Sequence, residues 1–396
     1  MSHRLNRIAR KLLTGTHALE PEISSRIVDM DSSGRVPDSL IDSLRTIGIF
    51  RMFVPAEAGG LELDLPSALT IIRTICRTDA SIGWLCGISG LNAIFATHVP
   101  RGLYDRVYSR GPDVLIAGAA QPAGRAEPDS GGGFRVTGRW PYVSGCVHAD
   151  WIQAFSVVAD ARADAAKKQS DVPDAPVITG LMAPASRWGI DDTWHVLGMK
   201  GTGSHHISLN DQHFSDEYFF DPAGGALFDG PLYQSPLHFL PLLHAAMSIG
   251  VAEAAMDDLV HLANTGLRQW RAAKPLGESE QFQIELGRLE AGINAARAYY
   301  EAQLDVHWQR AQAKTLNDKS LHTRGIQAAA WIAARCVKIA DTCFALGGAS
   351  TVYEASPLQR RLRDLRVMTQ HAIVQPRQYA SVGELLLSTS RPAAQG

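Results

Sequence analysis

The strongest constraint on the fold of this 396-residue chain is a change of hydrophobic period, from helical to extended and back to helical. Residues 1–111 carry the three- and four-residue spacing of helices that bury one face. Between 112 and 225, short apolar runs are separated by turn-rich segments such as 129–133, which is typical of strands joined by hairpins. Residues 226–396 return to helical spacing. This order predicts an α+β fold with a helical N-terminal domain (1–111), a middle antiparallel, barrel-like β domain (112–225) and a C-terminal four-helix bundle (226–396).

The longest apolar stripe of the C-terminal part predicts one long helix against a partner helix. It consists of Phe282, Leu286, Leu289, Ile293, Ala296, Tyr300 and Leu304. A second stripe runs from Ile326 to Phe344 with the same spacing. Bundles of such helices often bury their remaining faces against other subunits, so we expect an oligomer.

Composition excludes several classes of protein. The chain has 38 Lys and Arg against 40 Asp and Glu, and this balance gives no attraction for nucleic acid or an anionic membrane. The N-terminus lacks the apolar core of a secretory signal, and no apolar stretch reaches the length of a membrane span. The five cysteines lack paired spacing, which favours reduced thiols. We therefore expect a cytoplasmic protein, with a solvent-exposed loop at 161–176 inside the β domain.

Common cofactor and metal motifs are missing from the sequence. The glycines of 198–203 lie between strand-like runs and do not begin a helix. They therefore do not form a dinucleotide-binding motif. His205 and His206 are neighbours on a predicted strand and point to opposite faces, and we predict no metal site. Without a nicotinamide site, any redox role needs electrons from outside the chain. The arginines of 360–366 are interpreted first as an ion-paired helix face, with phosphate binding as the alternative.

Three segments, in order, resemble the acyl-CoA dehydrogenase fold. The family's first-domain signature ends in Pro-Glu-x-x-Gly-Gly. Residues 47–60 resemble it and end in Pro55-Ala56-Glu57-Ala58-Gly59-Gly60. Residues 139–145 resemble the middle-domain strand that passes the flavin ring. Residues 344–348 and 356–366 resemble the segment that reaches a neighbouring subunit's flavin.

Dehydrogenases of this fold need a carboxylate base, and this chain lacks it at both family positions. One position holds Gln370-His371-Ala372 and the other holds Phe239-Leu240-Pro241. Phe344 replaces a glutamine that helps hold the flavin tail, which suggests weaker flavin retention. The chain is more similar to flavin-dependent monooxygenases of this fold, the oxygenase components of two-component systems such as 4-hydroxyphenylacetate hydroxylase.

That resemblance implies a reaction. Such proteins take reduced flavin from a separate NAD(P)H-dependent reductase, bind O2, form a C4a-hydroperoxyflavin and are usually homotetramers. Either FAD or FMN is compatible, with FAD slightly preferred. By resemblance Ser144 lies at flavin N5, His371 near the C4a oxygen and His98 in the substrate cavity. The expected activity is hydroxylation or epoxidation of a small phenol- or indole-like compound.

Elementary chemistry supports the two catalytic candidates. A hydroxyl such as that of Ser144 can hold the N5 proton without adding charge in a dry site, and an imidazole such as that of His371 can move a proton near neutral pH. The alternatives are a strand-end hydroxyl for Ser144, a buried core histidine for His371 and a helix-end cap for His98.

Further site candidates are weighed against ordinary packing or surface roles. The expected substrate-binding residues are Trp84, Ile88, Asn92, Phe95, His98, Phe239 and Leu243. The expected cofactor-binding residues are Trp140, Tyr142, Val143, Ser144, Ser204, Arg271, Gln281, Gly347 and Gly348. Two rival functions share the fold: an acyl-CoA dehydrogenase with an unusual base, and an N-hydroxylase of amines or sugars. A non-catalytic helical assembly protein is the rival from another class.

Overall fold

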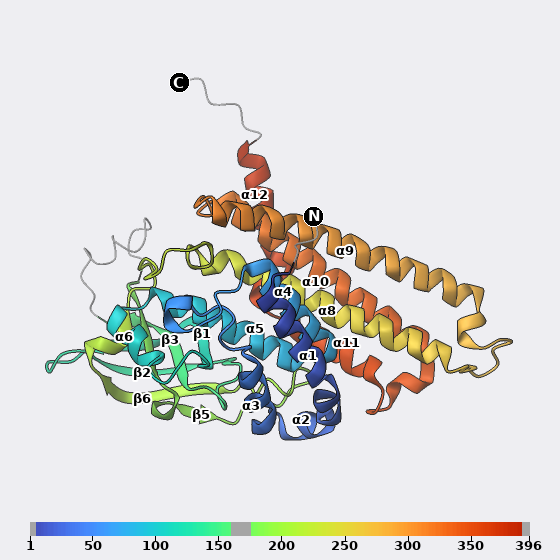
Figure 1. Ribbon diagram of the computed structural model, residues 1–396, viewed down its shortest axis with the longest axis horizontal. Helices are drawn as coiled ribbons and strands as arrows, with labels where there is room; N and C mark the ends of the chain where they lie inside the picture. Colours follow the sequence, from blue (N-terminus) through green and yellow to red (C-terminus); the bar gives the residue numbers. More distant parts are fainter. Residues whose placement is uncertain (1–4, 160–175, 390–396) are drawn as a thin grey trace.

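The computed structural model describes residues 5–159 and 176–389. The loop expected at 161–176 lies outside these residues, apart from its last position. Within the described part, helices, strands and helices follow one another as the hydrophobic periods predict, and the sheet lies at one end of a long helical body (Figure 1).

The first helices build the N-terminal unit. They are α1 (Arg7–Ser25), α2 (Ile27–Ser33), α3 (Asp38–Ile47), α4 (Leu65–Thr78), α5 (Ala80–Phe95) and α6 (Arg101–Val107). Asp79 caps α5 by accepting the N–H of Ile82 at 2.9 Å. Helix α5 is buried over nearly its whole length between α4, α8 and β1, so it forms the centre of the molecule.

Seven strands form one sheet in the order β5-β6-β2-β1-β3-β4-β7. They are β1 (Ile116–Pro128), β2 (Phe134–Trp140), β3 (Trp151–Val158), β4 (Ile178–Pro184), β5 (Gly189–Asp191), β6 (His206–Phe214) and β7 (Phe219–Phe220). The expected antiparallel pairing holds for the other neighbouring strands, whereas β1 and β3 pair in parallel, so the sheet is mixed. Strand β2 returns along one side of β1 as a hairpin, and residues 141–150 then carry the chain back across to the other side.

Long helices build the C-terminal bundle. They are α8 (Pro236–Asn264), α9 (Glu280–Gln312), α10 (Lys319–Gly347) and the shorter α11 (Pro357–Met368), followed by α12 (Tyr379–Thr389), which projects from the bundle (Figure 1). The stripe on α9 is buried at Phe282, Leu289, Ile293, Ala296, Tyr300 and Leu304. The predicted long helices are therefore confirmed.

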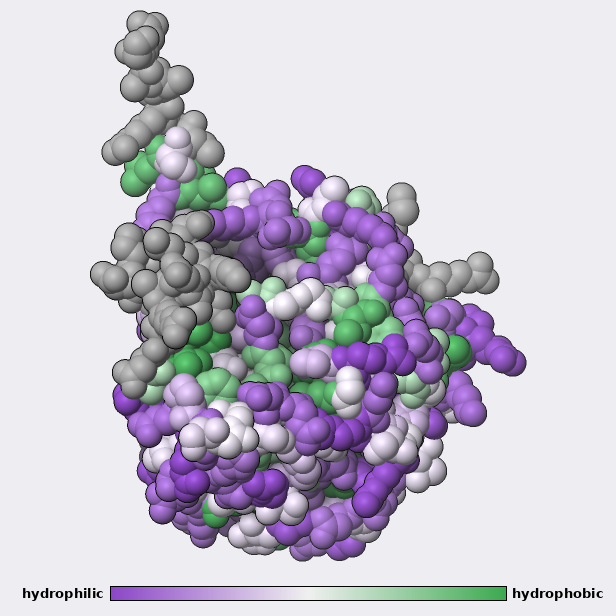
Figure 2. All heavy atoms as spheres, turned by 90° about the vertical axis from the view of Figure 1, so that its left-hand side faces the viewer, coloured by the Kyte–Doolittle hydropathy of each residue, from purple (hydrophilic) through white to green (hydrophobic). Residues whose placement is uncertain are grey.

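Contrary to the expectation from the sequence, two of the described helices, at 80–98 and 236–264, are long and apolar enough to cross a membrane by length and composition. In each, 89% of the most apolar window is buried inside the protein. Their apolar character is thus accounted for by packing in the core. The end of the molecule that carries the sheet is largely hydrophilic, with apolar side chains gathered across its middle (Figure 2).

The arginines of α11 tie the bundle to the N-terminal helices. Arg360 pairs with Asp79 at 2.6 Å, and Arg361 donates to the carbonyl of Thr78 at 2.9 Å while it pairs with Asp258 of α8 at 3.1 Å. The interpretation of 360–366 as an ion-paired helix face is confirmed. All five cysteines are buried free thiols, as their spacing predicts.

Candidate flavin site

Ser144 lies in the connection between β2 and β3, where the chain turns sharply. Tyr142 and Gly145 have φ angles of 63° and 75°, so the backbone is bent on both sides of the serine. The half-buried Ser144 Oγ accepts the indole N–H of Trp84 at 2.9 Å and lies 2.8 Å from Ser204 Oγ. The hydroxyl is therefore held by α5 on one side and by the segment before β6 on the other.

His371 lies in the turn after α11. Its Nδ1 accepts the backbone N–H of Ile373 at 3.3 Å, which leaves the ring proton on Nε2 when the imidazole is neutral. Burial lowers the pKa of His371, because the interior disfavours the charged form. The ring is therefore a neutral N–H donor at neutral pH.

Trp84 joins these two candidates. Its ring centroid lies 5.8 Å from that of His371, and its indole N–H is bonded to Ser144. Three parts of the chain thus meet at one place. Trp84 comes from the N-terminal helices, Ser144 from the connection between β2 and β3, and His371 from the C-terminal bundle. The sequence predicted all three residues, but not that Trp84 contacts both of the others.

His244 is a fourth member of this cluster that the sequence did not reveal. Its buried ring lies 5.5 Å from Trp84, edge to face, and 5.6 Å from His371. Its Nε2 donates to the carbonyl of Met368 at 3.1 Å, and the same carbonyl accepts the backbone N–H of His371 at 3.3 Å. Burial lowers the pKa of His244 to about 3, so its ring is neutral. In sequence it is one histidine in an apolar helix, with no signal beyond that of an ordinary core residue.

Several predicted site residues lie in the core instead. Trp140 has no exposed surface, donates to the carbonyl of Phe155 at 2.7 Å and packs in the core of the sheet. Val143 is also fully buried there. The side chains of Trp140 and Val143 are therefore packed within the protein, and their predicted part in cofactor binding stays a prediction.

The predicted substrate residues of α8, and Asn92 of α5, are also buried. Phe239 and Leu243 are 1% and 3% exposed, and Leu243 packs against Gly87 of α5. Asn92 donates to the carbonyl of Ile116 at 3.0 Å and accepts from Gln153, and so ties α5 to the sheet. Their hydrogen bonds and packing are satisfied within the protein, and their predicted part in substrate binding stays a prediction.

His98 lies at the other end of α5 from Trp84. The rise of about 1.5 Å per helical residue separates the two by roughly 20 Å along the axis. His98 Nδ1 donates to the carbonyl of Gly224 at 2.9 Å, and its Nε2 is buried without a partner. Ile88 and the half-buried Phe95 lie along α5 between these positions. The structure thus does not bring His98 to the Ser144–His371 cluster.

The remaining cofactor candidates are spread over the chain. Ser204 is bonded to Ser144, whereas Tyr142 is 70% exposed beside them. Arg271 and Gln281 are exposed, in and just after the connection from α8 to α9, and Gly347 and Gly348 end α10 near Gln269. Their predicted part in holding a flavin tail across subunits stays a prediction.

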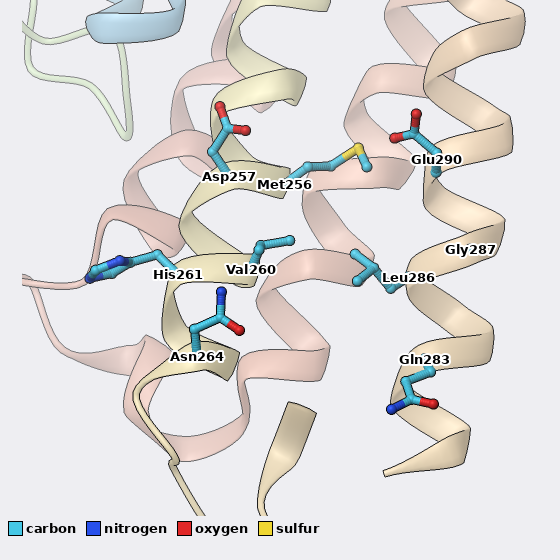
Figure 3. Close-up of a pocket in the computed structure, with 9 residues that line it drawn as sticks. All are labelled: Met256, Asp257, Val260, His261, Asn264, Gln283, Leu286, Gly287 and Glu290. Carbon is cyan, nitrogen blue, oxygen red and sulfur yellow. The ribbon is translucent and has the colours of Figure 1, made fainter. Parts of the chain in front are cut away.

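A pocket of about 650 Å³ lies elsewhere, between α8 and α9 (Figure 3). Its lining residues are Met256, Asp257, Val260, His261, Asn264, Gln283, Leu286, Gly287 and Glu290. None of them belongs to the Ser144 cluster. We therefore place the candidate site at the cluster and not at this pocket.

Two family models match the chain. Residues 16–98 match the acyl-CoA dehydrogenase N-terminal domain, and residues 242–376 match the acyl-CoA dehydrogenase C-terminal domain. A pigment production hydroxylase of Rhodococcus sp. is 30% identical over 382 residues, which cover 92% of this chain and 92% of that protein. An indole-3-acetate monooxygenase of Pseudomonas putida is 28% identical over 363 residues, covering 91% and 90%.

The chain belongs to the flavin-dependent monooxygenases of the acyl-CoA dehydrogenase fold. Other relatives are named as oxygenase subunits or components of flavin-dependent hydroxylases. The solved structure of XiaF from Streptomyces sp., in complex with FADH2 and glycerol, has a TM-score of 0.86, 23% identity and coverage of 98% of this chain and 97% of its own. That likeness shows the fold.

The cluster of this oxygenase fits a reduced flavin. Ser144 and His371 are both half-buried and therefore reachable, and the Trp84 indole beside them is 9% exposed. The isoalloxazine ring of reduced flavin carries an N–H at its edge. The hydroxyl of Ser144 can accept this N–H, and the aromatic rings beside it can pack against the isoalloxazine. Ser144, Trp84 and His371 would hold the isoalloxazine edge.

Proposed function

We propose that the chain is the oxygenase component of a two-component system that hydroxylates or epoxidises a small aromatic or heteroaromatic compound, phenol- or indole-like. It would receive reduced flavin from a separate NAD(P)H-dependent flavin reductase. The single observation that carries this proposal is the junction of Ser144, Trp84 and His371. Bound reduced flavin would supply the activation of O2.

Residues of this chain would contribute by holding the N5 proton of the flavin and by transferring a proton when oxygen is transferred to the substrate. The Ser144 hydroxyl would accept the N5–H and so keep that proton in place. The neutral His371 would present its Nε2–H to an oxygen atom and manage the proton when oxygen is transferred. Packing of Trp84 and His244 behind these groups would keep water out.

The acidic residues of α8 do not favour the dehydrogenase alternative. Glu253 is buried and paired with Arg73 and with Arg297, so its carboxylate is neutralised by two guanidinium groups. Asp257 and Asp258 are paired with Arg77 and Arg361. A carboxylate base for proton removal from a thioester would need a free side chain beside the flavin.

The names of the relatives support a class of substrate and a cofactor for this chain. One is named for indole-3-acetate, and a Rhizobium protein is named as an FADH(2)-dependent resorcinol hydroxylase. Both substrates are small electron-rich rings, which supports the proposed class. The name of the resorcinol hydroxylase and the FADH2 complex of XiaF support FAD over FMN. Long helices with partly exposed faces support a homotetramer, and free thiols support a cytoplasmic location.

The test combines the purified chain with NADH, a flavin reductase and FAD or FMN. We expect phenols or indoles to gain one oxygen atom, with 18O from 18O2 in the product, and no product when the reductase is left out. Failure to oxygenate any member of a broad aromatic panel, together with bleaching of bound flavin by an acyl-CoA thioester, would contradict the proposal.

A further inference from the structure

Three hydroxyls form a row that ends at Ser144. Thr202 Oγ1 lies 2.8 Å from the carbonyl oxygen of Met199 and 2.7 Å from Ser204 Oγ. Ser204 Oγ lies 2.8 Å from Ser144 Oγ. Thr202 and Ser204 are 1% and 3% exposed, so bulk water does not compete for their protons.

The contact of Thr202 with the Met199 carbonyl sets the direction of the row, because in the other two contacts either oxygen can donate. A carbonyl accepts and cannot donate, so the proton of Thr202 points to Met199. Each hydroxyl carries a single proton, and therefore Ser204 must donate to Thr202 and Ser144 must donate to Ser204. Trp84 Nε1 is a donor only, and it fills one lone pair of Ser144. Ser144 therefore has one lone pair free to accept a hydrogen bond and no proton left to donate.

The start of the row is fixed by the C-terminal bundle. The N–H of Met199 donates to the buried Asp364 of α11 at 2.6 Å, and Met199 adopts a positive φ of 56°. Next to it, a Cβ on Gly198 would lie 2.5 Å from the backbone of Arg363. This close contact holds the Met199 carbonyl in place, and with it the direction of the row.

From this geometry we infer that Thr202 and Ser204 are positioning residues that make the site selective for reduced over oxidised flavin. The inference rests on the proposed function, in which Ser144 faces N5. Reduced flavin presents an N5–H donor, which matches the free lone pair of Ser144. Oxidised flavin presents an N5 acceptor, which meets a second acceptor and gains no bond. A protein that must capture reduced flavin and release the oxidised form would benefit from this polarity.

The test compares dissociation constants of the full chain for reduced and oxidised FAD under anaerobic conditions. Thr202→Val keeps the volume but removes the acceptor of Ser204, so Ser204 can donate to Ser144, and Ser144 can then donate to oxidised N5. We expect the preference for reduced flavin to fall by about fivefold to tenfold, the size of one hydrogen bond. Ser204→Ala should act in the same direction and serves if the first variant does not fold.

Two variants serve as controls. Thr202→Ser keeps the hydroxyl and should restore the preference, whereas Thr179→Val removes a β4 hydroxyl outside the row and should leave it unchanged. An unaltered preference in both Thr202→Val and Ser204→Ala, while the wild type binds reduced flavin, would overturn the inference alone. A wild type that binds neither form of flavin would overturn the proposed function as well.

Discussion

At the residue scale, the proposed role of the Ser144 hydroxyl can be tested directly by substitution. The Ser144→Ala substitution removes the proposed acceptor of the N5 proton and should leave the fold of residues 141–150 unchanged. We expect hydrogen peroxide to be released at the expense of product, because nothing else at the junction holds that proton. The ratio of product to peroxide measures the effect. Ser156→Ala, at a buried β3 hydroxyl without a side-chain partner, is the control; equal coupling in both variants would remove Ser144 from the mechanism.

His371 is expected to act on the reacting oxygen and not on flavin binding. His371→Ala should therefore slow product formation by roughly 100- to 10000-fold, as for other general acid–base groups, with little change in affinity for reduced flavin. Single-turnover kinetics and an anaerobic flavin titration measure the two quantities separately. His195→Ala changes an exposed histidine and should have neither effect. Normal turnover in His371→Ala would show that the ring only packs.

His244 should matter by positioning, since it is fully buried. His244→Phe keeps the ring but loses the bond to the Met368 carbonyl, which should cost about 1 kcal/mol of unfolding free energy and loosen the turn that bears His371. We expect slower product formation at unchanged flavin affinity. His238→Phe, in the same helix but outside the cluster, should not slow it; a similar loss of rate in both variants would argue for a general effect on α8.

The sequence pointed to Ser144 and His371 through its resemblance to flavin-dependent monooxygenases, and to Trp84 as an aromatic side chain of the same region; their roles stay predictions. It could not identify His244, whose role depends on a contact between α8 and the turn after α11. It also could not show that Trp140 and Phe239 are fully packed in the core, because an aromatic side chain in a core and one beside a cofactor look alike in sequence.

At the scale of elements, the approach of α11 to residues 197–204 decides whether the site forms. Gly198→Ala would place a Cβ 2.5 Å from the backbone of Arg363. We expect a loss of about 1–3 kcal/mol in unfolding free energy, because backbone on both sides must move. Gly225→Ala, where a Cβ would meet nothing within 4 Å, is the matched control. Denaturant unfolding that gives equal values for both variants would contradict this close contact.

The type of each element followed from its period, but the pairing of strands did not. The hairpin of β1 and β2 was predictable from a short turn, whereas the parallel pairing of β1 with β3 depends on the path of residues 141–150. That path is also what brings Ser144 to α5. The position of the site was therefore less predictable than the residues in it.

At the scale of the whole molecule, buried histidines should make stability depend on pH. Burial lowers the pKa of His148 and His238 to about 4, whereas an unfolded histidine has a pKa of about 6.5. Between these values the unfolded chain binds protons that the folded chain does not, so stability falls as pH falls below about 6.5. Each histidine adds a slope of at most about 1.4 kcal/mol per pH unit. Asp364, whose pKa is raised to about 6 by burial, opposes this trend as a single group.

Urea unfolding between about pH 7 and pH 5 measures this dependence. We expect the unfolding free energy to decrease over that range and the slope to be smaller in His238→Phe. A free energy that stays level or rises toward pH 5 would mean that the buried imidazoles do not control stability.

We propose that the junction of Ser144, Trp84 and His371 shields bound reduced flavin from water until a substrate binds. The most direct measurement mixes an anaerobic complex of the chain and reduced flavin with oxygenated buffer and follows the return of the oxidised-flavin absorbance. We expect a long delay relative to free reduced flavin. An aromatic substrate should shorten this delay and be recovered as oxygenated product. Return of the oxidised absorbance at the rate seen in buffer alone would contradict it.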